Sequence, residues 1–167
     1  MDPHLKATLW QQCGAAIDML ENAMRACPEE LWSDRSRQPG FSYLAYHTLF
    51  WLDLYLSGSI EGFVPPKPFN RDELDPAGII PDPPWSKELL LDYLARCRSK
   101  CRATIEGMTE EEARARTRFY WGEADGVEKL LYSLRHVQHH AAQLNLILRQ
   151  TIDSAPRWVF RAKEEIV

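Results

Sequence analysis

The sequence lacks any apolar run long enough to cross a membrane, and it lacks an excess of positive charge. Its most apolar stretch, YLAYHTLFWLDLYL, is interrupted by His47 and Asp53, whereas a spanning helix needs about 20 apolar residues. The opening segment, MDPHLKATLW, has no basic region followed by an apolar one, so no secretory signal is expected. The net charge of −4 argues against a broad nucleic-acid-binding face. These absences predict a cytoplasmic protein that binds neither membrane nor nucleic acid.

The chain has four cysteines: Cys13, Cys27, Cys97 and Cys101. Cytoplasmic thiols stay reduced, so their even number does not by itself predict disulfides. Cys97 and Cys101 lie four residues apart in an apolar helical stripe. That position is typical of core packing rather than of a chelating pair.

No internal repeat, low-complexity tract or linker divides the chain. Its 167 residues correspond to about one domain with a substantial core. The 45% apolar and 26% charged content is that of a globular protein. We therefore expect a single domain over residues 1–167.

Four segments carry the apolar period of 3.6 residues that marks an amphipathic helix. They span about residues 4–26, 42–57, 86–106 and 126–150, and a short helical piece is expected in TEEEARAR at 109–116. Ser86 and Asp125 are placed to cap helix starts, and Thr109 with Glu112 has capping-box spacing. Gly58 is placed to end the second helix.

The segment between the second and third helices, residues 58–85, holds seven of the eleven prolines and has no apolar period. Such a long loop inside a domain is typically functional or a crossover. As a crossover it would make the helices at 42–57 and 86–106 roughly parallel. The sequence thus predicts an all-α, four-helix bundle with a long Pro-rich crossover between helices 2 and 3.

Charged residues on the third helix follow its apolar positions at helical spacing: Arg96, Arg98, Lys100 and Arg102. This spacing predicts a solvated helix face. Asp53, six residues after His47, lies on a different helix face from that histidine and is expected to be solvated or to cap a helix.

Three of the five histidines fall within RHVQHHAAQ, and two of them share a helix face. His136 and His140 are four residues apart, so both rings can converge on one divalent cation, whereas His139 points elsewhere. His47 lies in the apolar stripe of the second helix. A histidine on a single apolar helix face is commonly a core residue. Because an unpaired buried imidazole is costly, histidines on two apolar faces are better explained if the two faces meet.

Three imidazoles from two helices would leave one coordination position open, as in a catalytic metal site. A divalent ion is expected, with Zn or Ni first and Fe, Mn or Cu as alternatives. A di-iron carboxylate bundle is not expected, because its paired Glu-x-x-His signature is missing.

The segment HVQHHAAQLNLILRQ resembles the closing helix of the DinB-like (damage-inducible, YfiT-type) metalloproteins, in which His-x3-His precedes Gln and an apolar residue. YLAYHTLFWLDLYL is similar to their second helix, which carries a third histidine. The resemblance implies a four-helix bundle, frequently a homodimer, with His47, His136 and His140 as metal ligands. Ala142 stands where the family commonly has Gly.

Relatives with known activity use the metal to activate a low-molecular-weight thiol, which implies a thiol S-transferase acting on a small-molecule substrate, in detoxification or stress response. A metal-dependent hydrolase and a non-enzymatic, metal-stabilised dimeric binding module are the alternatives. Four aromatic residues are candidates for the mouth of the site, although aromatic residues at helical spacing more often pack in the core: Trp51, Tyr55, Tyr120 and Trp121.

Overall fold

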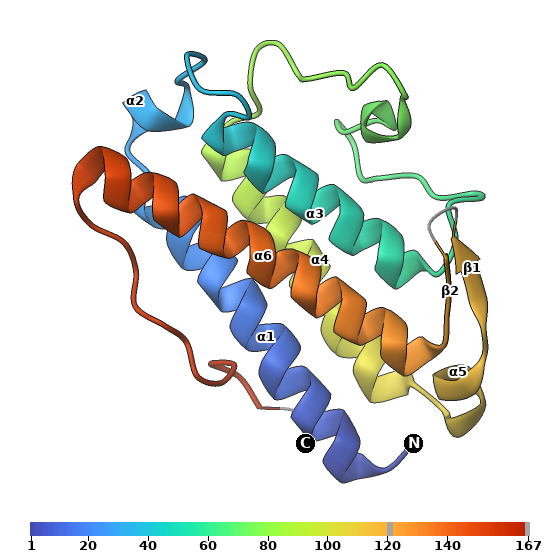
Figure 1. The fold of residues 1–167 in the computed structure, drawn as a ribbon. Helices are drawn as coiled ribbons and strands as arrows, with labels where there is room; N and C mark the ends of the chain where they lie inside the picture. The colour runs from blue at the N-terminus through green and yellow to red at the C-terminus, as the bar shows by residue number, and fades with distance from the viewer. Residues whose placement is uncertain (120–121, 166–167) are drawn as a thin grey trace.

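Four long helices make up most of the structure, a computed structural model that describes residues 1–119 and 122–165 (Figure 1). They are α1 (Pro3–Ala26), α3 (Phe41–Ser57), α4 (Lys87–Gly107) and α6 (Gly126–Ile152). Each predicted helix agrees with the observed one to within two residues at either end. The all-α prediction is confirmed.

Several short elements join these helices. They are α2 (Glu29–Trp32), the 3-10 turn η1 (Asp72–Leu74), α5 (Glu110–Arg114), and the antiparallel strands β1 (Thr117–Phe119) and β2 (Gly122–Ala124). Only α5 was expected from the sequence. The others are three or four residues long, which is too short for an apolar period to register.

The predicted boundary residues act as caps. The side chains of Ser86 and Asp125 accept hydrogen bonds from the first turns of α4 and α6. Thr109 and Glu112 form the expected capping box at α5. Gly58 ends α3 with a φ of 82°, a left-handed conformation that side chains oppose and glycine allows.

The long crossover sets the direction of the helices. In Figure 1, α1 and α6 run one way and α3 and α4 run the other, because the segment after α3 returns outside that helix before α4 begins. The predicted parallel pair is therefore confirmed. Helix α6 packs against both α1 and α3, and α4 packs against the same two helices from the other side.

The chain after α6 runs back along α1 (Figure 1). Ala162 N–H donates to the carbonyl of Gln11 at 3.0 Å, and Trp10 Nε1 donates to the carbonyl of Glu164 at 2.7 Å. Within the described residues, no helix has both the length and the apolar character that a membrane crossing requires.

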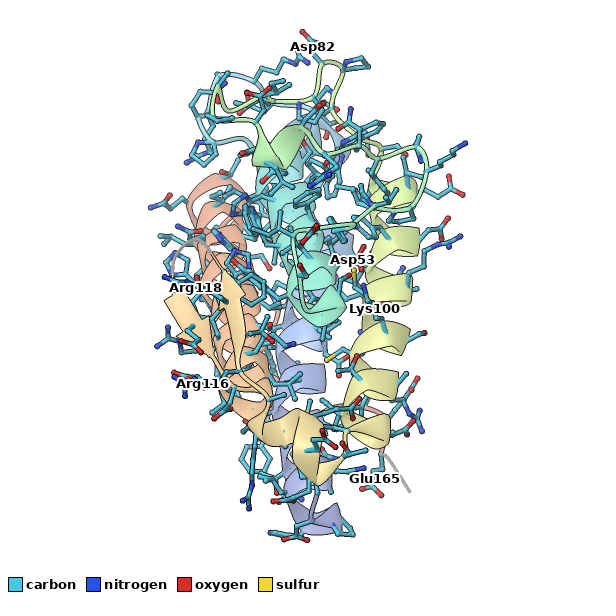
Figure 2. The ribbon with its side chains drawn as sticks, turned by 90° about the vertical axis from the view of Figure 1, so that its right-hand side faces the viewer. Asp53, Asp82, Lys100, Arg116, Arg118 and Glu165 are labelled. Atoms are coloured by element: carbon cyan, nitrogen blue, oxygen red, sulfur yellow. The ribbon has the colours of Figure 1, made fainter. Side chains whose placement is uncertain are left out.

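The prediction that the charged residues of α4 form a solvated face is wrong for two of the four, Arg98 and Lys100. Arg98 binds the fully buried Asp18 of α1 at 2.7 Å. Lys100 binds the buried Asp53 of α3, and Figure 2 shows these two side chains where α3 and α4 meet. The expectation that Asp53 is solvated or a cap is also wrong, since Tyr93 donates a further hydrogen bond to its carboxylate at 2.9 Å.

Replacement of Lys100 by Met should leave the Asp53 carboxylate without its cation in a mostly dry contact. Loss of one partner of a buried pair costs about 3–5 kcal/mol, and we expect about 2 kcal/mol here because the ammonium is partly hydrated. Urea unfolding measures the change. Arg96→Met, at an exposed position of the same helix, is the matched control; equal stability of the two variants would contradict this role for the ion pair.

Candidate metal site

His47 of α3 meets His136 and His140 of α6 where these antiparallel helices pack. The ring centroid of His47 lies 5.4 Å from that of His136 and 4.9 Å from that of His140. The centroids of His136 and His140 are 4.5 Å apart. One ring nitrogen from each residue lies within 4.8 Å of the other two. The structure thus brings together the three histidines that the sequence singled out.

His139 stands apart from this cluster. Its side chain is exposed, although its ring centroid is 5.0 Å from that of His140. Among the described residues it is not part of any group able to hold a metal. The helical spacing explains this, because position 139 is turned about 100° from position 140.

Glu73, in the η1 turn of the crossover, approaches the cluster from outside α3. Its Oε2 lies 2.6 Å from His47 Nδ1 and accepts a hydrogen bond from Trp51 Nε1 at 3.1 Å. The side chain is only 2% exposed. No local pattern marks this carboxylate in the sequence, since the crossover has no period that would indicate which of its residues turn inward.

His140 has a partner of its own on α6. Its Nδ1 lies 2.7 Å from the amide oxygen of Gln143, one turn along the helix. An Nδ1–H that donates to Gln143, like one that donates from His47 to Glu73, leaves the Nε2 lone pair of that ring free to bind a cation. Such outer partners are usual for histidines that bind metals.

Two of the three rings, those of His136 and His140, are kept neutral by their surroundings, as a metal ligand must be. Burial, and to a lesser extent the neighbouring imidazoles, lowers the pKa of His136 to about 3 and that of His140 to about 4. His136 Nδ1 is buried and has no hydrogen-bond partner within the described part of the chain. Tetrahedral ligands at about 2.0–2.1 Å from a metal lie about 3.4 Å from one another, so a small ring adjustment suffices. This donor set fits a divalent ion.

The cysteines do not contribute a competing site among the described residues. All four are buried free thiols, with Cys97 and Cys101 only 1% and 2% exposed. Burial raises the pKa of the Cys97 thiol and that of Cys27, the latter to about 12. The interpretation of Cys97 and Cys101 as core residues is confirmed.

Aromatic side chains pack against the three histidines. The Trp51 ring is 6.2 Å from that of His47, and the Tyr55 ring is 5.8 Å from that of His136. Both are buried, so they belong to the core and the site together. The other two aromatic candidates, Tyr120 and Trp121, lie outside the described residues. A surface hollow of about 300 Å³ beside His136 is lined by Tyr132, Arg135 and His139.

A family model described as the DinB superfamily matches residues 12–144, which include all three histidines, the whole of α3 and the part of α6 that carries His136 and His140. The chain belongs to the DinB superfamily. This agrees with the resemblance seen in the α3 and α6 segments. No curated protein matches this DinB-superfamily chain closely enough to indicate a relationship.

Acid should destabilise the metal-free protein through its buried histidines. The unfolded chain binds protons below about pH 6.5, whereas folded His136 resists protonation to about pH 3. Protonation of the unfolded chain therefore lowers the free energy of unfolding as the pH falls, and the effect is absent above about pH 7. We expect His136→Gln to reduce the loss between about pH 7 and about pH 5 by about 2 kcal/mol.

Urea unfolding in chelator at several pH values measures this difference. His139→Gln, at the exposed neighbouring histidine, should keep the pH dependence of the unsubstituted protein. Parallel pH profiles for His136→Gln and the unsubstituted protein would contradict the buried, neutral state of His136.

Proposed function

We propose that His47, His136 and His140 bind one divalent metal ion, Zn or Ni first, and that the site activates a low-molecular-weight thiol for transfer to a small electrophile. The observation that carries the proposal is the convergence of three half-buried imidazole nitrogens within 4.8 Å. When bound, such an ion supplies a Lewis acid with an open position, which lowers the pKa of a thiol or a water held there.

The chain's own residues orient the ligands. Glu73 contacts the Nδ1 of His47, and Gln143 contacts that of His140, so Nε2 is the nitrogen of each ring that is left to bind the ion. Trp51 ties Glu73 to α3 by a second hydrogen bond. Buried aromatic rings limit water around the cluster, which strengthens every electrostatic interaction inside it.

Hydrolysis is the second candidate function, and Glu73 is the observation that favours it. Its Oε1 is buried and has no hydrogen-bond partner among the described residues, so this oxygen is available to accept a proton from a water near His47. A non-enzymatic, metal-stabilised binding module is the third candidate. The homodimer and the cytoplasmic location implied earlier stay predictions.

Metal content tests the ligand set directly. Protein purified without a histidine tag should hold about one ion per chain, as a three-imidazole site requires. His47→Ala and His136→Ala should each abolish binding, whereas His139→Ala should keep it. Metal content is measured by elemental mass spectrometry. Equal metal content in all three variants would contradict the proposed site.

Removal of the Glu73 carboxylate by Glu73→Gln should weaken metal binding without removing a ligand. Loss of an outer partner of a metal-binding histidine typically costs 10–100-fold in affinity, and we expect about tenfold. Competition with a chelator of known affinity measures the change. Asp72→Asn, the adjacent carboxylate on the same turn, is the control and should leave the affinity unchanged.

Thiol transfer is tested by the consumption of monochlorobimane with common cellular thiols. Metal-loaded protein should accelerate thiol alkylation, and His136→Ala should lose that acceleration. If activated esters or amides are cleaved while no thiol is consumed, hydrolysis replaces transfer as the function. If neither reaction is accelerated, the binding-module alternative holds.

A further inference from the structure

A cavity of about 200 Å³ lies one helical turn before His47, at the start of α3. Three segments enclose it: the loop before α3, the first turns of α3, and the end of the crossover. Its lining includes Arg37, Tyr43, Tyr46 and Trp85. None of these residues belongs to the metal ligand set.

Three polar groups of this lining are buried and have no hydrogen-bond partner within the described part of the chain. They are Arg37 Nε, the Tyr46 hydroxyl and Trp85 Nε1. Tyr46 as a whole is only 1% exposed. All three can donate a hydrogen bond, and a buried donor left unpaired is costly, so native structures rarely keep one without use. Three around one cavity indicate a ligand rich in acceptors.

The start of α3 adds to this preference. Its N-cap is Gly40, which offers no side chain to the helix, and the first turn holds no acidic residue. Gly40 and Ser42 both line the cavity. The unpaired N–H groups and the dipole of a helix N-terminus favour an anion. With the Arg37 guanidinium close by, the anion is an oxyanion such as a carboxylate.

Two carboxylates also line the cavity, but both already have partners. Asp34 accepts a hydrogen bond from the backbone N–H of Ser36 at 2.8 Å. Asp82 is bound to Arg35 at 2.5 Å and stands at the outer end of the crossover (Figure 2). Hydrogen bonds from Ser36, and the Arg37 charge, lower the pKa of Asp34, but none of the three buried donors has an aspartate oxygen as its hydrogen-bond partner among the described residues.

The cavity and the histidine cluster share a wall. Tyr43 lines the cavity, and its ring centroid is 6.0 Å from that of His47, which lies four residues later on α3. We propose that the cavity binds the carboxylate of the small molecule whose thiol end reaches the three histidines. This proposal rests on the proposed function and adds a substrate class: thiols that carry a carboxylate.

A length series of thiols tests the proposal. The zinc-loaded protein is titrated by calorimetry with ω-mercaptopropionate, ω-mercaptohexanoate and ω-mercaptoundecanoate, each paired with the ω-mercaptoalcohol of the same length. At the length that spans both sites, the carboxylate should improve affinity on the order of tenfold, as charged hydrogen bonds do. A ratio of about one at every length, or no thiol binding at all, would overturn the proposal.

The variants Tyr46→Phe and Arg37→Gln test whether the higher affinity of the carboxylate thiols arises in the cavity. Each should weaken carboxylate binding more than alcohol binding and so reduce the carboxylate-to-alcohol ratio toward one, and Arg96→Gln, on exposed α4 surface, should keep the full ratio. Because the Tyr46 hydroxyl has no partner in the described residues, Tyr46→Phe should melt at or above the temperature of the unsubstituted protein. A full ratio in both cavity variants would exclude this cavity as the carboxylate site.

The outcome is separable from that of the proposed function. If the ratio behaves as expected but no electrophile is consumed, the carboxylate subsite stands and the transferase proposal fails. If an electrophile is consumed while the ratio stays near one, the transferase stands and the subsite fails.

Discussion

Desolvation of three imidazoles at one point of the α3–α6 contact is the constraint on which the site depends. A buried neutral ring needs a partner for its N–H and for its lone pair. Glu73 and Gln143 supply partners on the Nδ1 side of His47 and His140. One ring nitrogen from each histidine lies within 4.8 Å of the other two, so a single divalent cation would satisfy them together. Glu73 belongs to the crossover, which passes outside α3 before the chain starts α4, and this path brings its carboxylate to His47.

The fold could be predicted to a large extent from local patterns. Apolar periods located the four long helices, and caps such as Ser86 and Asp125 fixed their ends. The proline-rich crossover indicated that α3 and α4 run parallel. Within the site, spacing alone separated His136 and His140 from His139, because the geometry of a single helix decides which rings share a face. Their meeting with His47 was a hypothesis from the sequence, and the packing of α3 on α6 provides it.

What the sequence did not reveal depends on contacts between distant segments. Glu73 turns inward from an aperiodic loop, so no local pattern marks it. Asp53 and Lys100 are each polar residues near the edge of an apolar stripe, and only the packing of α3 on α4 shows that they pair. The cavity beside Tyr46 is likewise assembled from three separate segments. The spacing of residues along the chain determines which side chains share a helix face. Tertiary packing determines which of these faces contact one another.

The central claim is that three imidazoles, and no sulfur, hold the metal. X-ray absorption at the zinc edge of the loaded protein tests it most directly, since imidazole nitrogen and thiolate sulfur differ in bond length and scattering. We expect nitrogen or oxygen ligands at about 2.0–2.1 Å from the zinc, with the outer-ring scattering of about three imidazoles. A shell containing sulfur at about 2.3 Å, or the scattering of a single imidazole, would contradict it.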